Sequence, residues 1–130
     1  MCNVADVTNK NITENFAYKN LTCPCCDRIK LNDRTYRHME LLQEMRTKLN
    51  FPIYVNSGYR CKQHNIDVGG SVKSQHMEFA TDIRPSYQDG FKQRLKAIYD
   101  MAEKLGFDGI GRYESFIHVD LRGSKARWNS

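Results

Sequence analysis

The stretch FIHVDL, residues 116–121, limits the possible folds more than any other part of the chain. Apolar residues alternate in it with His118 and Asp120, and this period of two predicts a β-strand with two unlike faces. The apolar face belongs against a core, whereas a buried imidazole and a buried carboxylate both need polar partners. The sequence therefore predicts a sheet that carries a polar site on one of its faces.

A second strand is predicted at ATDI, residues 80–83. The same period puts Ala80 and Asp82 on one face, and the small Ala80 leaves space around the carboxylate. If this strand pairs with the first, then His76, Asp82 and His118 can converge. Two imidazoles and one carboxylate are a usual ligand set for a catalytic zinc with an open fourth position. The alternative for each residue taken alone is a solvated or hydrogen-bonded side chain.

Two amphipathic helices accompany these strands. Apolar residues recur every three or four positions after a cap at Asn32 or Asp33, and again from a cap at Ser86 or Asp89 to Gly106. The first stripe consists of Tyr36, Met39, Leu42, Met45 and Leu49, and the second of Phe91, Leu95, Ile98, Ala102 and Leu105. Both patterns predict helices that bury one side in a core.

The remaining patterns complete a small α+β domain. Residues 51–60 predict a strand that runs into a Ser-Gly turn, residues 61–71 a loop, and residues 110–121 a hairpin that ends the fold. The first 20 residues are polar and predict a loosely ordered arm on a single domain that spans residues 1–130. Because no series of βαβ units is present, we expect a mainly antiparallel sheet flanked by helices.

The formal charge of +5 at pH 7 favours anionic partners, such as nucleic acid, acidic lipid or the carboxylate-rich bacterial wall. Nucleic-acid recognition is disfavoured, because the aromatic residues among the basic ones fall in the buried helical stripes. No apolar run reaches the roughly 20 residues of a membrane span, and the N-terminus lacks the pattern of a secretory signal. We expect a monomer that is made in the cytoplasm and acts elsewhere only if delivered.

The cysteines allow two interpretations. Cys23 and Cys26 have C-x-x-C spacing with Cys25 between them, and Cys61 and His64 have C-x-x-H spacing. A structural zinc held by three cysteines and a histidine is therefore arithmetically possible. The favoured interpretation is that reduced thiols pack the two segments together.

Three segments resemble, in this order, the zinc peptidases of the M15 type: SGYRCKQHN, GGSVKSQHMEFATDI and GIGRYESFIHVDLRG. This group includes D-alanyl-D-alanine carboxypeptidases and phage L-alanyl-D-glutamate endopeptidases, and it shares its fold with the hedgehog signalling domain. The likeness covers roughly residues 20–128. It implies a zinc-dependent peptidase that cleaves peptidoglycan stem peptides, as a DD-carboxypeptidase or an endopeptidase with a lytic or wall-remodelling role. The alternative is a non-catalytic module on the same fold that binds cell wall or protein.

The resemblance also implies roles for single residues. Arg60 corresponds to the arginine that helps to hold the substrate, and a guanidinium suits the carboxylate or carbonyl oxygens of a peptide. Ser74 and Gln75 flank the first ligand, where they could donate to an oxyanion or orient the imidazole. The zinc ligands implied are His76, Asp82 and His118.

The chain departs from the family pattern in the first ligand segment. Five residues, MEFAT, separate His76 from Asp82 where the family has six, and Phe79 lies near the place of a family glycine. A deletion within a strand would turn Asp82 to the wrong face, whereas a deletion in the preceding turn would not.

The second departure concerns the general base. Ser115 stands where many relatives have an acid, three residues before the last histidine. Glu114, one residue earlier, is the predicted base. Asp120 is the alternative base, or a group that orients His118.

Overall fold

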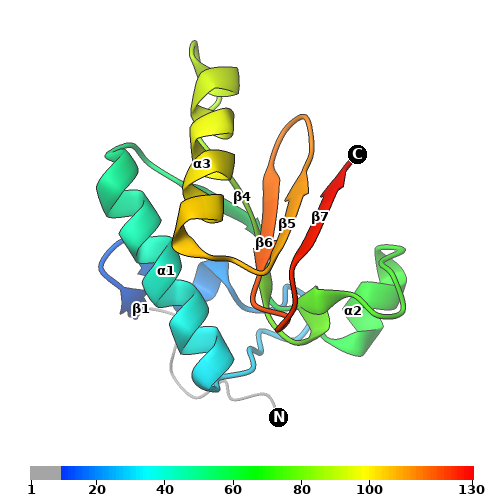
Figure 1. The fold of residues 1–130 in the computed structure, drawn as a ribbon. Helices are drawn as coiled ribbons and strands as arrows, with labels where there is room; N and C mark the ends of the chain where they lie inside the picture. The colour runs from blue at the N-terminus through cyan, green and yellow to red at the C-terminus, as the bar shows by residue number, and fades with distance from the viewer. Residues whose placement is uncertain (1–9) are drawn as a thin grey trace.

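A computed structural model describes residues 10–130 of the chain. Its main sheet has five strands in the order β3-β4-β6-β5-β7, and two helices, α1 and α3, lie on one side of it while α2 lies on the other (Figure 1). The strands of this sheet are β3 (Tyr54–Ser57), β4 (Ala80–Arg84), β5 (Gly109–Arg112), β6 (Ile117–Asp120) and β7 (Ala126–Asn129). The helices are α1 (Asp33–Leu49), α2 (Lys62–Asp67) and α3 (Phe91–Leu105), with short 3-10 turns η1 (Tyr18–Asn20) and η2 (Gln75–Met77).

The two long helices form where the sequence predicts them. The side chain of Asn32 caps α1 by accepting a hydrogen bond from the Thr35 N–H, and α3 ends at Gly106 in a left-handed conformation with φ 86°. The start of α3 differs from the prediction, because Gly90 precedes the helix and makes no side-chain cap. Tyr36, assigned to the apolar stripe of α1, is 45% exposed.

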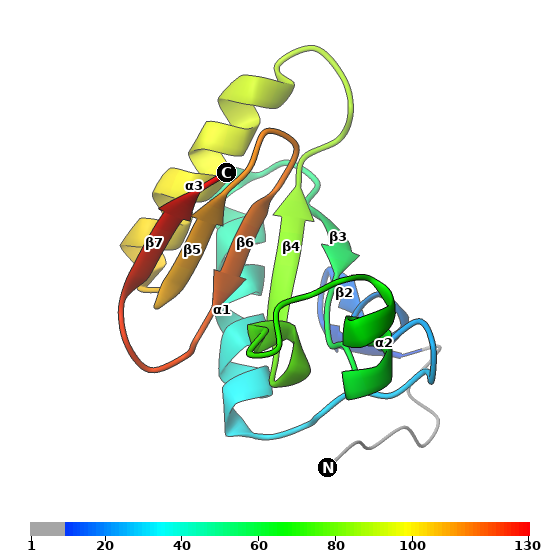
Figure 2. The same ribbon diagram turned by 90° about the vertical axis from the view of Figure 1, so that its right-hand side faces the viewer.

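The sheet has an apolar face and a polar face, as the alternation in β4 and β6 predicts. Ile83 pairs with Ile117 and Thr81 with Val119, and these four buried side chains pack toward the helices. The alternate pairs, Ala80 with Asp120 and Asp82 with His118, therefore point to the opposite face, which Figure 2 turns toward the reader. An α+β fold with a mainly antiparallel sheet is confirmed.

Three parts of the fold differ from the sequence-based expectations. Residues 61–71 contain the helix α2 rather than only a loop. The hairpin does not end the fold, because β7 adds an edge strand parallel to β5. Within the predicted arm, the strands β1 (Asn11–Thr13) and β2 (Phe16–Ala17) pair and bury Phe16, whereas residues 1–9 lie outside the described part.

A histidine lies fully buried between α1 and the sheet. Nε2 of His38 lies 2.9 Å from the Thr81 hydroxyl oxygen, and the ring packs edge-on against Phe79 and Phe107. Nδ1 has no hydrogen-bond partner among residues 10–130. Burial lowers the pKa of His38 to about 3. The imidazole is therefore neutral in the folded protein at physiological pH.

We expect this histidine to make the protein less stable in mild acid. The unfolded chain binds a proton at His38 near pH 6.5 and the folded chain does not, so stability is complete above that pH and is lost as pH falls toward 3. The expected loss between pH 7 and pH 5 is about 2 kcal/mol in the free energy of unfolding. Urea unfolding at several pH values measures it. His38→Gln should flatten the slope and His64→Gln should not; an equal slope in the His38 variant contradicts the prediction.

Candidate functional site

Three side chains from different parts of the chain meet on the polar face of the sheet. Asp82 lies on β4 and His118 opposite it on β6, and His76 reaches them from η2. The carboxylate atom Oδ1 of Asp82 lies 3.2 Å from Nε2 of His76 and 3.1 Å from Nδ1 of His118. The three possible ligand atoms all lie within 4.8 Å of one another. The five-residue connection MEFAT thus lets the two ends of the motif come together.

The neighbours of the two imidazoles determine which ring nitrogen carries hydrogen. Nδ1 of His76 donates to the Gly58 carbonyl oxygen at 2.7 Å, and Nε2 of His118 donates to Oδ2 of Asp120 at 2.7 Å. In the neutral rings the other nitrogens, which face Asp82, therefore carry lone pairs. The lone pairs of the two nitrogens and the Asp82 oxygen repel one another, and a cation bound between them would remove this repulsion. The donor set and the outer hydrogen bonds could therefore hold a metal ion.

The ionisation of these groups fits the same picture. Burial opposes the charge on Asp82, but the hydrogen bonds to His118 and His76 outweigh it and lower its pKa to about 2. Burial also opposes protonation of His118, but Asp120 and Asp82 outweigh it and raise its pKa. In the absence of a metal ion, a proton on His118 thus supplies the positive charge that the cluster attracts.

Asp120 is a fully buried carboxylate behind His118. Its two oxygens accept hydrogen bonds from Arg122 Nε at 2.9 Å and Arg122 Nη2 at 2.7 Å, besides the one from His118. A Cβ on Gly109, the partner of Asp120 on β5, would lie 2.5 Å from its oxygens, so only glycine leaves room for the carboxylate there. Both oxygens of Asp120 are thus occupied, and one of them is bound to the His118 ring.

The cluster lies in the wall of an open cavity of about 390 Å³. Cationic and aromatic side chains surround it, and Asp82 is the one carboxylate among the described residues of the lining. Besides the cluster, the lining includes Arg60, Lys73, Ser74, Gln75, Tyr113, Phe116, Arg122 and Trp128. A cavity with this charge is suited to an anionic ligand.

Arg60 is held at the edge of this cavity. Its Nη1 donates to the side-chain oxygen of Asn65 at 3.0 Å, and Asn65 in turn donates to the Ser71 carbonyl oxygen at 2.8 Å. A Cβ on Gly70 would collide with the Arg60–Asn65 pair, so glycine is required beside it. Within the described part of the chain, Nε of Arg60 is buried without a hydrogen-bond partner. A carboxylate or carbonyl oxygen of a ligand could satisfy this guanidinium.

The two residues before His76 are placed by hydrogen bonds. The Ser74 hydroxyl accepts from the His76 N–H at 3.2 Å and so caps η2, which fixes the backbone of the first ligand. The side-chain oxygen of Gln75 accepts from Arg34 Nη2 at 2.8 Å. Both residues line the cavity, as their proposed roles require.

Glu114 is not brought to the cluster. It is exposed in the turn between β5 and β6 and lines a different hollow, together with Lys92 and Lys96. Its neighbours Tyr113 and Phe116 stack on each other with ring centroids 4.3 Å apart and do line the cavity. The predicted base, Glu114, is thus adjacent in sequence to a residue that lines the cavity, but Glu114 itself lines the other hollow.

Sequence reasoning missed the residues that β7 contributes. The Trp128 ring lies 5.1 Å from the His118 ring, and its Nε1 donates to the Tyr113 hydroxyl at 3.0 Å. A Cβ on Gly111 would collide with this indole, so glycine at position 111 leaves room for the Trp128 ring. Nothing in ARWN marks a functional strand, whereas Arg122 could have been found from its place two residues after Asp120.

Within the described residues, no helix is both long and apolar enough to cross a membrane.

No curated protein matches the chain. A family model described as peptidase M15 matches residues 14–120, a span that contains all three members of the cluster. On this match over most of its length, the chain belongs to the peptidase M15 family.

Proposed function

We propose that the chain is a zinc-dependent peptidase that cleaves peptidoglycan stem peptides, as a DD-carboxypeptidase or an endopeptidase with a lytic or wall-remodelling role. The observation that carries this proposal is the meeting of two imidazole nitrogens and one carboxylate oxygen in the wall of a cationic cavity. Membership of a peptidase family supports the reaction type. The likeness to wall-acting M15 peptidases and the anionic nature of stem peptides support the substrate.

In this proposal His76, Asp82 and His118 hold the zinc. Bound zinc supplies a Lewis acid that polarises the scissile carbonyl and makes a water molecule nucleophilic near neutral pH. The protein contributes the fixed orientation of the ligands, because the Gly58 carbonyl holds the His76 proton at Nδ1 and Asp120 holds the His118 proton at Nε2. The cavity walls leave the cluster accessible from one side, where a peptide can approach.

The test is digestion of purified cell wall with and without a metal chelator, followed by mass analysis of the released products. Release of D-alanine indicates a carboxypeptidase, and release of longer stem fragments indicates an endopeptidase. Both activities should disappear with the chelator and return with added zinc. Cleavage that persists after complete removal of metal contradicts the proposal.

A non-catalytic module that binds the wall or a protein is the second candidate. It is favoured by one observation, namely that the described lining of the cavity has no carboxylate besides Asp82. Ser115 at the position of the usual family acid agrees with it. Binding to cell wall without any chelator-sensitive cleavage would favour this module over the peptidase.

Arg60 is proposed to anchor the substrate. Arg60→Ala should raise KM about tenfold with little change in kcat, because a hydrogen bond to a charged group contributes about 1.5 kcal/mol or more. The measurement is steady-state hydrolysis of a stem peptide. Arg37→Ala is the matched control, since Arg37 is exposed on α1 and its loss changes the net charge equally. An unchanged KM in the Arg60 variant would exclude the anchoring role.

Asp120 is proposed to orient His118. Asp120→Asn should weaken zinc binding on the order of tenfold, because the amide lacks the negative charge that holds the His118 proton, and its NH2 would face the Arg122 Nε–H that now donates to Oδ1. Competition with a chromophoric chelator measures the zinc affinity. Asp100→Asn, at an exposed acid on α3, is the control for charge. Equal affinities of the two variants would show that the hydrogen bond to His118 is dispensable.

A further inference from the structure

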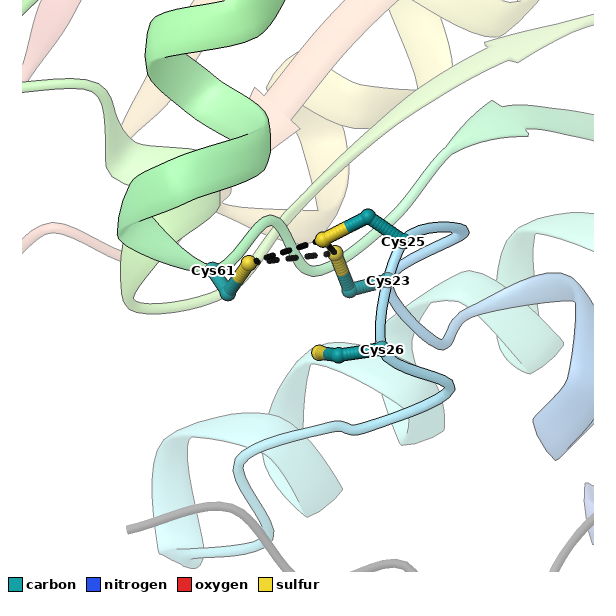
Figure 3. Close-up of side chains that lie close together, drawn as sticks. All are labelled: Cys23, Cys25, Cys26 and Cys61. Carbon is teal, nitrogen blue, oxygen red and sulfur yellow. Dashed lines mark hydrogen bonds between the residues drawn. The ribbon is translucent and has the colours of Figure 1, made fainter.

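A second cluster of possible metal ligands lies away from the candidate catalytic site. Cys23, Cys25 and Cys26 come from one turn, and Cys61 comes from the start of α2, so segments far apart in the sequence meet here (Figure 3). The Sγ atom of Cys61 lies 3.6 Å from that of Cys23 and 3.1 Å from that of Cys25. All four sulfur atoms lie within 4.8 Å of one another.

The local backbone explains how three cysteines of one turn reach the same point. The Cys23 carbonyl oxygen accepts hydrogen bonds from the Cys26 N–H at 3.4 Å and the Asp27 N–H at 2.7 Å, while the Cys23 N–H donates to the Arg28 carbonyl at 2.7 Å. Asp27 has the left-handed conformation that reverses the chain, with φ 56°. The turn is therefore closed on itself and presents its thiols toward Cys61.

We propose that Cys23, Cys25, Cys26 and Cys61 bind a structural zinc ion. Four sulfurs at about 2.3 Å from one zinc lie about 3.8 Å apart. The Cys23–Cys25 and Cys23–Cys61 sulfur separations are both 3.6 Å, and the Cys25–Cys61 separation of 3.1 Å would widen when the ion binds. Neutral thiols are weak hydrogen-bond partners and give little reason for four of them to gather. On binding, the four thiols release four protons to solvent and the site acquires a net charge of −2.

The ligand set differs from the one that the sequence spacing suggests. The spacing made His64 a possible fourth ligand, but His64 contributes its backbone N–H, which donates to the Cys61 Sγ at 3.4 Å and stabilises a thiolate there. Cys25 takes the place of the histidine in the cluster. Four protein ligands leave no open coordination position, so this zinc has a structural and not a catalytic role.

The proposed zinc joins two segments that support the candidate catalytic site. The Tyr59 N–H donates to the Leu21 carbonyl at 2.9 Å, next to the cysteine turn. On the other side of the same segment, the Gly58 carbonyl accepts from the His76 ring and the Arg60 N–H donates to the His76 carbonyl at 2.8 Å. A zinc bound to Cys61 would therefore hold in place the backbone that orients His76 and carries Arg60.

The experiment measures metal directly and needs no activity. The full chain, purified under reducing conditions without oxygen, is loaded with Co²⁺ and its absorption spectrum is recorded. Sulfur-to-cobalt charge transfer and intense tetrahedral bands are expected, and they should persist in His76→Ala, which removes a ligand of the other site. Zinc content should be two ions per wild-type chain and one per chain of that variant. If only the peptidase proposal fails, the wild type should contain one zinc ion per chain and the cobalt spectrum of the cysteine cluster should be unchanged.

Two variants separate the possible ligand sets. Cys61→Ser should weaken the charge-transfer bands, which scale with the number of bound thiolates, whereas His64→Gln should leave their intensity unchanged. Loss of the bands in the His64 variant, or their absence from the wild type, would overturn the proposal. Disulfides among the four cysteines, detected by intact mass under these reducing conditions, would also overturn the proposal.

A measurement on the wild type covers the case in which Cys61→Ser does not fold. N-ethylmaleimide should leave four cysteines unmodified while zinc is bound and label them after chelation. Rapid labelling of these cysteines in zinc-loaded protein would equally overturn the proposal.

Discussion

Replacing His76 with alanine is expected to remove one zinc ion per chain and all detectable hydrolysis of stem peptides. Asp82 and His118 alone leave the metal with two protein ligands instead of three, which is too few for a catalytic zinc. Metal analysis and a peptide-release assay on the same preparation measure both losses. Full hydrolysis by a variant that holds no metal at this site would refute the zinc peptidase.

This variant needs a check on folding, because the Gly58 carbonyl loses the partner that His76 provides. An unsatisfied buried acceptor costs about 1–3 kcal/mol, so a lower melting temperature is expected but not unfolding. His64→Gln is the matched control, since it removes a histidine outside the cluster. It should retain both zinc ions and full activity.

Replacing Glu114 with glutamine is expected to lower kcat about 100-fold, with little change in KM or zinc content. The prediction rests on our proposal that Glu114 accepts the proton of the attacking water. The Glu114 carboxylate lies outside the cavity. Glu114 and Ser115 are both exposed at the tip of the turn, and the stacked rings of Tyr113 and Phe116 hold the two ends of the turn in place. A movement of Glu114 and Ser115 alone would therefore bring the Glu114 carboxylate into the cavity without moving the residues that line it.

Ser115→Ala is the control for this substitution, because it changes the same turn without removing an acid. Single-turnover hydrolysis at several pH values adds a second readout, since loss of a base also removes the acidic limb of the pH profile. An unchanged kcat in Glu114→Gln would exclude this residue. The alternative base that the sequence offers, Asp120, would then be the next residue to test.

Asp82 and His118 could be predicted to share a site, because polar and apolar residues alternate in the two strands that carry them. The alternation in FIHVDL and ATDI fixes which side chains share a face, and the antiparallel register then puts Asp82 directly opposite His118. His76 lies outside the strands, and its position follows from the likeness to the M15 motif and not from any period. The family match over residues 14–120 supports that likeness.

The shortened motif shows why a length difference was hard to judge. Phe79, near the place of the family glycine, is buried in the core against His38, and its carbonyl accepts from Arg34. The residue thus turns away from the site, and the strand register of Asp82 starts only afterwards, at Ala80. A missing residue before the strand leaves the face of Asp82 unchanged.

The features that escaped prediction lack a periodic signal. The helix α2 has the sequence KQHNID, whose six residues are too few for an apolar stripe, and β7 has only Trp128 as a large apolar residue. Similarly, the spacing of the cysteines could not tell Cys25 from His64 as the fourth ligand. That choice depends on the direction of a turn, which the left-handed Asp27 sets.

The way in which His76 is held affects how this protein can change by mutation. Its ring and its carbonyl are both bound by main-chain groups, of Gly58 and Arg60, and a substitution at position 60 keeps the main-chain N–H unless it introduces proline. Gly58 is constrained more strongly, because a Cβ there would lie 2.6 Å from the Leu21 carbonyl oxygen. In a library that randomises the cavity lining to alter substrate preference, the ligand geometry should therefore survive most changes outside Gly58.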